Sequence, residues 1–212
     1  MNTTSAALDA RGFAALTGVS RETLARLEAY AELLARWSGR INLVGRNTLG
    51  DMWRRHFLDS AQLIAHLPDR AHSIIDLGSG GGFPGLVLAA MGVAGVELVE
   101  ADARKCAFLR EAARVAEADV RIHQARIEAI PPPPRDVVVA RGCAPLDRLL
   151  ALGVRVIGPQ TRCLFLKGEH AGDELAKARA RWRMAVTSHR SRADPRGVVL
   201  SLSEIAHVPV DA

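Results

Sequence analysis

Cysteine is rare in this sequence of 212 residues, which contains only Cys106, Cys143 and Cys163. The three are an odd number, lie far apart and form no Cys-x-x-Cys pair. This spacing argues against a disulfide scaffold and against a zinc site. We therefore expect reduced thiols, as in a cytoplasmic protein, and no bound metal ion.

The sequence also lacks an N-terminal signal and a long apolar run. Its first residues, MNTTSAALDARG, have neither the basic start nor the apolar centre of a secretion signal. The longest nearly apolar stretch, residues 83–96, contains three glycines and is too short to cross a bilayer. We expect a soluble, cytoplasmic protein without a membrane partner.

Lysine is scarce as well, because it supplies only three of the 28 positive charges and arginine supplies the rest. The net charge is +5, a mild basic excess. The planar guanidinium group suits bidentate contacts with phosphates and guanine edges, which favours a nucleic acid partner. A coding sequence rich in G and C would produce the same bias, so the charge alone does not identify the partner.

The order of hydrophobic patterns predicts an α/β fold. Two helical patterns come first: Ser20 caps one that ends before Gly39, and the second runs from Leu49 to Leu67. From residue 73, short apolar strands alternate with helices, which is typical of a parallel sheet covered on both faces. Strands are expected at residues 73–78, 95–100, 120–125, 136–141, 162–168, 185–190 and 197–202, and helices at 83–92, 103–117, 144–157 and 173–184.

The last two strands have no long helix between them, so they are expected to form an antiparallel hairpin. The predicted fold class is therefore Rossmann-like, a mostly parallel seven-stranded sheet with helices on both faces and an N-terminal helical segment. We expect two units: an N-terminal helical cap, residues 1–69, and a cofactor-binding domain, residues 70–212.

The first predicted strand leads into the segment DLGSGGGFPG, residues 76–85. No Lys followed by Ser or Thr comes after its last glycine, which excludes a Walker A loop and its nucleoside triphosphate. Gly80, Gly82 and Gly85 do satisfy G-x-G-x-x-G between a strand and a helix. An NAD-dependent oxidoreductase therefore stays open as an alternative.

Asp76, Gly78, Gly80 and Gly82 form a second pattern, Asp-x-Gly-x-Gly-x-Gly, typical of Rossmann-like methyltransferases that use S-adenosylmethionine. This cofactor has no phosphate, so the loop needs only to let the backbone come close, and glycines allow this. The Asp76 carboxylate is placed to meet the cofactor's ammonium group, directly or through water. Glu100 ends the second strand and is expected to accept the two ribose hydroxyls, as the same acid does in NAD sites.

Four segments together carry a family resemblance: RHFLDS (55–60), DLGSGGGFPG (76–85), the arginine in VARG, and LKG (166–168). From the first helix to about residue 175 the chain resembles the bacterial 16S ribosomal RNA guanine-N7 methyltransferases, the glucose-inhibited division protein B family. The resemblance implies a methyltransferase domain over residues 70–212 that transfers a methyl group from S-adenosylmethionine to one guanine of small-subunit ribosomal RNA.

The resemblance also implies site residues. It places Gly78 and Phe83 at the cofactor, Ile127 and Glu128 at its adenine end, and Arg141 at the cofactor or ordering the site. The chain departs from the family where Ala140 and Gly142 flank Arg141 in place of Ser and Ala, and where NLV replaces NLT. Because Arg141 itself is kept, these departures put the surrounding loop in question more than the activity.

The expected chemistry agrees with a guanine N7 target, which carries a lone pair and no proton and therefore requires alignment rather than a general base. The chain has ARGCAP where methyltransferases of exocyclic amines carry Asp/Asn-Pro-Pro-aromatic. Cys143 lies nearby but lacks the Pro-Cys pair of cytosine- and uracil-C5 enzymes, so we interpret it as a small buried residue rather than a nucleophile.

Arg141 and Lys167 are our candidates for catalytic residues, since both follow strands at the ligand-binding rim of the sheet. His56 touches RNA, orders the glycine loop or is a hydrogen-bonded packing residue, and Trp37 and Trp53 are expected to pack rather than stack on bases. Arg46, Arg54, Arg55, Arg190, Arg192 and Arg196 contact RNA or lie on solvated surfaces.

The expected partner is 16S ribosomal RNA, alone or within the small subunit, and no feature requires a second copy of the chain. A non-catalytic RNA-binding assembly factor is the remaining alternative, although no sequence feature favours it.

Overall fold

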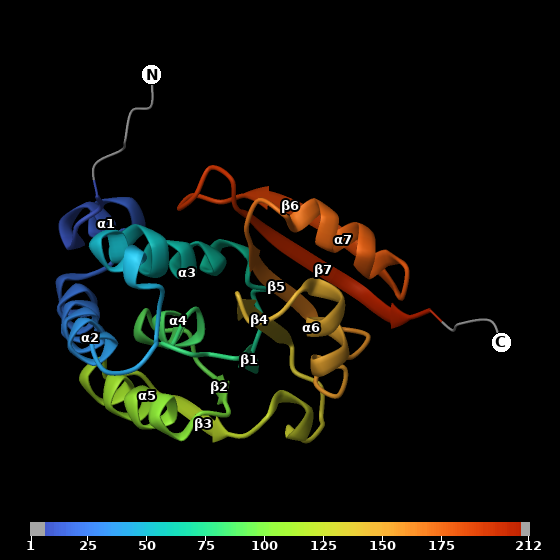
Figure 1. The fold of residues 1–212 in the computed structure, drawn as a ribbon, viewed down its shortest axis with the longest axis horizontal. Helices are drawn as coiled ribbons and strands as arrows, with labels where there is room; N and C mark the ends of the chain where they lie inside the picture. Colours follow the sequence, from blue (N-terminus) through green and yellow to red (C-terminus); the bar gives the residue numbers. More distant parts are fainter. Residues whose placement is uncertain (1–6, 209–212) are drawn as a thin grey trace.

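The computed structural model describes residues 7–208 and contains one seven-stranded sheet (Figure 1). Its strands are β1 (Ile74–Leu77), β2 (Val96–Glu100), β3 (Val120–Gln124), β4 (Val137–Arg141), β5 (Arg162–Lys167), β6 (Trp182–Arg190) and β7 (Val198–His207). They lie in the order β3-β2-β1-β4-β5-β7-β6 across the sheet. The predicted Rossmann-like class is confirmed.

The strand order determines where a ligand can bind. Strands β1 to β5 are parallel, while β7 pairs antiparallel with both β5 and β6, which confirms the terminal hairpin. From the centre, β1 leads outward to β2 and β3, whereas β4 leads outward in the opposite direction to β5. Ligands of open α/β sheets bind beyond the carboxyl ends of the strands at such a reversal, here after β1 and β4.

Helices cover both faces of the sheet (Figure 1). They are α1 (Ala10–Thr17), α2 (Arg21–Ser38), α3 (Asp59–Ala61), α4 (Gly85–Ala90), α5 (Ala103–Val115), α6 (Leu146–Gly153) and α7 (Ala171–Arg179). Successive strand residues point to opposite faces, so Ile74 packs in a first core with Leu27, Leu86 and Phe108 of α2, α4 and α5.

The adjacent Ile75 packs on the other face, in a second core with α6 and α7. Together the two cores bury the hydrophobic sides of all four helices that follow strands β1, β2, β4 and β5. Among the helices within residues 7–208, none has the length and apolar character needed to cross a membrane.

The segment expected to form one helix from Leu49 to Leu67 is irregular, so this prediction was wrong. It consists of a 3₁₀ turn (Arg46–Asp51), a π-helical stretch (Trp53–Leu58), the short α3 and a second 3₁₀ turn (Gln62–His66). The N–H of Asp59 donates to the carbonyl of Arg54, and the Ser60 hydroxyl donates to the carbonyl of His56 (2.7 Å). These bonds replace the regular helical pattern, and π-helical turns are frequent at functional sites.

All four helices predicted after strands are shorter than expected: α4 and α5 each end two residues early, and α6 and α7 end earlier still. The helix predicted over residues 173–184 is α7 and ends at Arg179, because Trp182 enters β6 and is buried in the second core. The helix predicted over residues 144–157 is α6, which ends at Gly153. Both predictions extended the helical pattern into residues that pack as strand or loop.

The N-terminal helices begin at capped residues. The predicted cap of α2 is present, since the Ser20 hydroxyl accepts from the Thr23 N–H (3.1 Å). Helix α1 was not predicted, although its cap is also a common type: the Asp9 carboxylate accepts from the Gly12 N–H (2.7 Å). Both helices contribute buried side chains to the first core, so they pack directly onto the sheet domain.

Tyr30 of α2 joins the N-terminal helices to the glycine loop. Its side chain is fully buried, its hydroxyl donates to the carbonyl of Gly81, and its ring stacks on Phe83 with 5.5 Å between centroids. A buried carbonyl without its donor costs more than the bond itself contributes. The hydroxyl therefore fixes the loop from the side of the helical segment.

Replacing Tyr30 by Phe keeps the ring and leaves the Gly81 carbonyl buried without its donor. We expect Y30F to lower the free energy of unfolding by about 1–3 kcal/mol, measured by urea denaturation. An unchanged m-value would show that the two proteins unfold alike. An unchanged midpoint would contradict the role assigned to this hydroxyl.

Candidate active site

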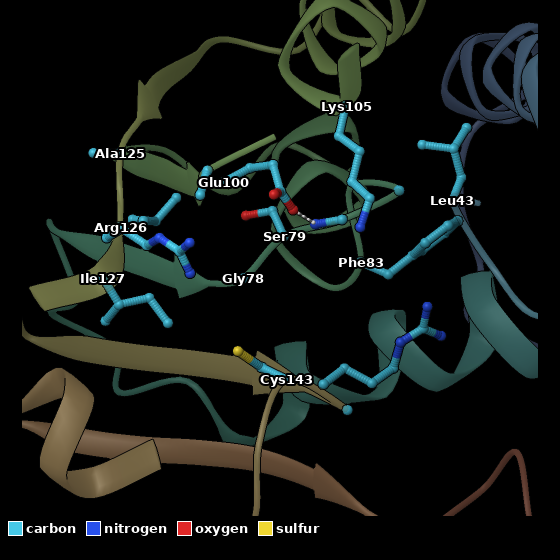
Figure 2. Close-up of a pocket in the computed structure, with 16 residues that line it drawn as sticks. Leu43, Gly78, Ser79, Phe83, Glu100, Lys105, Ala125, Arg126, Ile127 and Cys143 are labelled. Atoms are coloured by element: carbon cyan, nitrogen blue, oxygen red, sulfur yellow. Dashed lines mark hydrogen bonds between the residues drawn. The ribbon is translucent and has the colours of Figure 1, made fainter. Parts of the chain in front are cut away.

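A cavity of about 380 Å³ opens at the carboxyl ends of β1, β2 and β4, within the size range of small-ligand sites. Figure 2 shows Ile127 and Arg126 at one end of this first cavity and Phe83 and Leu43 at the other. Its lining residues are Leu43, Gly78, Ser79, Gly80, Gly81, Phe83, Val99, Glu100, Ala101, Lys105, Ala125, Arg126, Ile127, Arg141, Gly142 and Cys143.

The glycine loop forms the floor of the first cavity. A side chain would not fit at Gly78. Gly78 has a φ of +73°, in the left-handed region, and a β-carbon there would lie 2.5 Å from the Cys143 sulfur. The Ser79 N–H donates to the carbonyl of Val99 (2.9 Å), which holds the loop against β2. The backbone is therefore exposed to a ligand at Gly78 and Gly80, the two positions that the motif predicted.

Glu100 links the loop to the end of β2. Its Oε2 accepts from the Gly80 N–H (3.0 Å) and its Oε1 accepts from the Asp102 N–H (2.9 Å), as Figure 2 shows for the first bond. The carboxylate lines the first cavity and retains lone pairs beyond these two bonds. Its expected contact with ribose hydroxyls stays a prediction that this position supports.

Asp76 occupies a different environment from the one expected. Its carboxylate is fully buried beneath the loop and is not among the lining residues. Oδ2 accepts from the Gly85 N–H (3.0 Å) at the start of α4, whereas Oδ1 is buried without a hydrogen bond from residues 7–208. Burial raises the pKa of Asp76 to about 7. The structure gives Asp76 a supporting contact with the loop, and its contact with a cofactor ammonium group stays a prediction.

Arg141, at the end of β4, forms the wall opposite Glu100. Its Nη1 donates to the carbonyl of Arg55 (3.0 Å) and to Nδ1 of His56 (2.8 Å). Its guanidinium carbon lies 4.7 Å from the centre of the Phe83 ring, a cation–π contact. These contacts fix Arg141 between the glycine loop and the segment RHFLDS, which explains why the two motifs occur together.

The hydrogen bonds of His56 define its tautomer. A guanidinium only donates, so Nδ1 accepts from Arg141. The Thr48 hydroxyl donates to the carbonyl of Gly45 (2.6 Å), and its oxygen therefore accepts from the Nε2–H of His56 (2.7 Å). Burial, followed by the charges of Arg141 and Arg55, lowers the pKa of His56 to about 3. His56 is neutral near pH 7 and holds Arg141 in position.

A second cavity, of about 280 Å³, shares Arg141 and Gly142 with the first. Its other lining residues are Thr48, Arg55, His56, Asp59, Leu166, Lys167, Gly168, Ser191, Ala193, Asp194 and Gly197. The segment RHFLDS, the end of β5 and the β6–β7 loop meet at this cavity. It therefore brings residues of RHFLDS and LKG, two of the predicted motifs, next to Arg141.

Lys167 lies in this second cavity, but its ammonium group is held by neighbours. Nζ donates to the carbonyl of Ala144 (2.8 Å) and pairs with the Glu174 carboxylate (2.8 Å). The same Glu174 oxygen accepts from the Leu146 N–H (2.9 Å) at the start of α6. Lys167 thus supports the loop after β4, and its predicted catalytic role is not tested by these contacts.

Other predicted site residues divide between the cavity and the surface. Ile127 lines the first cavity, whereas Glu128 is exposed and is not among the lining residues. Burial raises the pKa of the Cys143 thiol, which disfavours a nucleophilic thiolate. Two cationic lining residues, Lys105 and Arg126, were missed. Lys105 lies in the first turn of α5, just after Glu100, and this position in the sequence could have predicted that it lines the cavity.

The remaining residues singled out in the sequence have structural contacts or lie on the surface. Trp37 and Trp53 pack against the first core, as expected. Arg55 pairs with Asp194 (2.6 Å), Arg192 donates to the carbonyl of Leu16 (3.1 Å), and Arg196 pairs with Glu169 (3.2 Å). Arg46 and Arg190 are exposed. Within residues 7–208, no cluster of three or more His, Cys, Asp or Glu side chains is placed to hold a metal ion.

The family model described as GidB, rRNA small subunit methyltransferase G, matches residues 23–194. This chain belongs to the GidB family. The family resemblance carried by RHFLDS and DLGSGGGFPG is thereby confirmed, and members of this family are methyltransferases that use S-adenosylmethionine. Neither the NAD-dependent oxidoreductase nor the non-catalytic factor is favoured.

Full-length relatives support the GidB assignment. "Ribosomal RNA small subunit methyltransferase G" of Rhodospirillum centenum is 55% identical over 197 residues, 93% of this chain and 91% of that protein. The protein of the same description from Rhodospirillum rubrum is 53% identical over 193 residues, 91% and 96% of the two chains.

The fold is similar to a solved TehB-like SAM-dependent methyltransferase from Corynebacterium glutamicum. The TM-score is 0.56 at 20% identity, over 84% of this chain and 99% of that one.

The first cavity of this GidB-family protein fits S-adenosylmethionine. Gly78 and Gly80 leave room for the ligand at the loop, and Glu100 offers carboxylate oxygens that accept hydroxyl protons. Ile127 supplies apolar surface at one end of the cavity, and Phe83 lies at the other. We expect the adenosine to lie between Glu100 and Ile127, with the methionine end toward Phe83 and Arg141.

We expect Glu100→Gln to weaken S-adenosylmethionine binding by about 10- to 100-fold, because hydrogen bonds to a charged group contribute about 1.5–3 kcal/mol each. Isothermal titration calorimetry measures the affinity. Glu111→Gln is the matched control, since Glu111 is half-buried on α5, pairs with Arg114 (2.6 Å) and is not among the residues that line the cavity. Equal affinities of the two variants would place the ribose elsewhere.

The neutral His56 makes the stability depend on pH. Unfolded histidine has a pKa of about 6.5, whereas folded His56 has one of about 3. The unfolded state therefore binds one more proton between these values, and stability falls as the pH decreases below about 6.5. We expect wild type to lose about 1.4 kcal/mol more than H56Q between about pH 7.5 and pH 5.5. The free energies of unfolding are measured by urea denaturation at both pH values. An equal loss of stability in wild type and H56Q would refute the assignment of a neutral His56.

Proposed function

We propose that this protein transfers a methyl group from S-adenosylmethionine to N7 of a single guanine in 16S ribosomal RNA. The observation that carries the proposal is the junction of the two cavities at Arg141 and Gly142. One cavity fits the cofactor, and the adjoining one is available to a base. The residues at the junction, a guanidinium and a glycine, offer no general base, which suits a nitrogen that carries no proton.

The chemistry that S-adenosylmethionine supplies when bound is an electrophilic methyl group on a sulfonium. The work of this chain is then to align N7 with that methyl group and to exclude water. Glu100 and the glycine loop hold the cofactor, while His56 and Phe83 keep Arg141 fixed at the junction. Lys167, through Ala144 and Glu174, holds the loop that carries Gly142 and Cys143. None of these groups needs to change its protonation state.

The N-terminal segment, residues 1–69, is proposed to cap the cofactor cleft of a methyltransferase domain formed by residues 70–212. Leu43 lines the first cavity, and Thr48 and His56 line the second, so the segment contributes to both. The exposed arginines Arg46 and Arg190 are available to phosphates of the RNA. A ribosomal RNA substrate, alone or within the small subunit, implies a cytoplasmic reaction, and we propose that one copy of the chain suffices for it.

The proposal is tested by transfer of a labelled methyl group to small subunits and to naked ribosomal RNA from cells lacking this protein. We expect label in 7-methylguanosine at one position. Arg141→Ala should reduce the rate by about 10²-fold, because it misplaces the junction of the two cavities. Arg114→Ala, which removes an exposed arginine of α5, is the control.

Label in another nucleotide would contradict the N7 assignment and keep the cofactor. No label in RNA, with S-adenosylmethionine bound, would contradict the RNA substrate.

A further inference from the structure

The second cavity contains a carboxylate that the proposed reaction does not use. Asp59 follows the π-helical stretch, and its side chain is 19% exposed. Oδ1 accepts from Nε2 of Gln62 (2.9 Å) and lies 3.5 Å from the Ser191 hydroxyl. Oδ2 lies 3.8 Å from Arg141 Nη1, beyond hydrogen-bond length. Within residues 7–208, Oδ2 accepts no hydrogen bond.

The other polar groups around the second cavity are already engaged. The two nitrogens of His56 bond to Arg141 and Thr48. Asp194 accepts from Arg55 at Oδ2 (2.6 Å) and from the Arg196 N–H at Oδ1 (2.9 Å). Asp59 is therefore the carboxylate of this cavity that keeps an oxygen available to a ligand. What it can take is a hydrogen-bond donor, because an ionised carboxylate only accepts.

The orientation of this acceptor is set before a ligand arrives. Gln62 Nε2 donates both to Asp59 Oδ1 and to the Asp59 carbonyl (2.9 Å each), and Gln62 Oε1 accepts from the Arg192 N–H (2.9 Å). Burial raises the pKa of Asp59 to about 6, while Arg141 and Arg55 act to lower it, so the group is mostly ionised at neutral pH. A half-buried anion with an unused oxygen gains from a ligand that donates to it.

We propose that Asp59 recognises the target base by accepting hydrogen bonds from guanine N1–H and from the 2-amino group. This inference rests on the proposed function, since it assigns the second cavity to the guanine. The two donors are adjacent on one edge of guanine, close enough for the available Oδ2 to accept from both, while Oδ1 stays bonded to Gln62. Adenine presents an acceptor at N1 and is rejected there, because two acceptors face each other. Guanine N7 lies on another edge and stays available for methylation.

The test removes the 2-amino group from the substrate and the charge from the protein. The guanine identified by the labelling experiment is replaced by inosine, which keeps N1–H, O6 and N7 but lacks the 2-amino group. We expect wild type to prefer the guanine RNA by about 10- to 100-fold in kcat/KM, in line with a hydrogen bond to a charged group. For Asp59→Asn the preference should fall to about 3-fold or less.

Asp194→Asn is the matched comparison, because Asp194 lines the same cavity but both of its oxygens are engaged. We expect this variant to slow both substrates and to keep the preference for guanine. Calorimetric binding of S-adenosylmethionine by D59N shows that the variant is folded. If D59N slowed both RNAs equally, Asp59 would only position Arg141, and the inference would be overturned.

Even if D59N fails to fold, the wild-type measurement alone can overturn the inference. Equal kcat/KM for guanine and inosine RNA would overturn the inference while leaving the proposed methylation intact. Failure of the proposed function would look different, because wild type would then methylate neither RNA.

Discussion

The hydrogen bond from Arg141 to Nδ1 of a neutral His56 (2.8 Å) is the contact on which the site depends. It exists only while the imidazole is unprotonated, and the environment of His56 ensures this by burying it beside two arginines. The other ring nitrogen, through Thr48, extends the chain of bonds to the Gly45 carbonyl. A single polar chain thus connects the end of β4 with the N-terminal segment, and both cavities obtain their common wall from it.

Sequence patterns predicted the sheet because an alternation of apolar strands and helices is compatible with few topologies. The glycines that follow the first strand also indicated at which end of the sheet a ligand binds. They could not predict the course of residues 49–67. Its apolar spacing is helical, but the segment must also present His56 and Asp59 to the sheet domain, and the tertiary contacts override the local pattern. Motif position likewise identified Asp76 and Lys167 without revealing that their polar groups bond to backbone groups of Gly85 and Ala144.

The site contains two buried or half-buried carboxyl groups that are not fully hydrogen-bonded. Asp76 is buried with a pKa of about 7, and one of its oxygens receives no hydrogen bond from the part of the chain that the structure describes; Asp59 has a pKa of about 6. Such groups lower stability, because burial of an ion without full hydrogen bonding is unfavourable. The surrounding cores provide the compensation: α2, α4 and α5 on one face and α6 and α7 on the other pack around fully buried strands. The stability that the two cores provide allows the site between them to keep carboxyl groups that lower stability.

An enzyme whose nucleophile is a neutral ring nitrogen has little need for proton transfer, so its polar groups are free to serve position and recognition. The structure is consistent with that division. His56 is fixed in one tautomer, Lys167 is paired with Glu174, and Cys143 is held as a thiol. Selectivity must then come from hydrogen bonds that only the correct base can form, and a site built to accept two donors rejects a base that lacks them. The preorganised carboxylate of Asp59, beside the wall shared with the cofactor cavity, has the chemistry that this requirement demands.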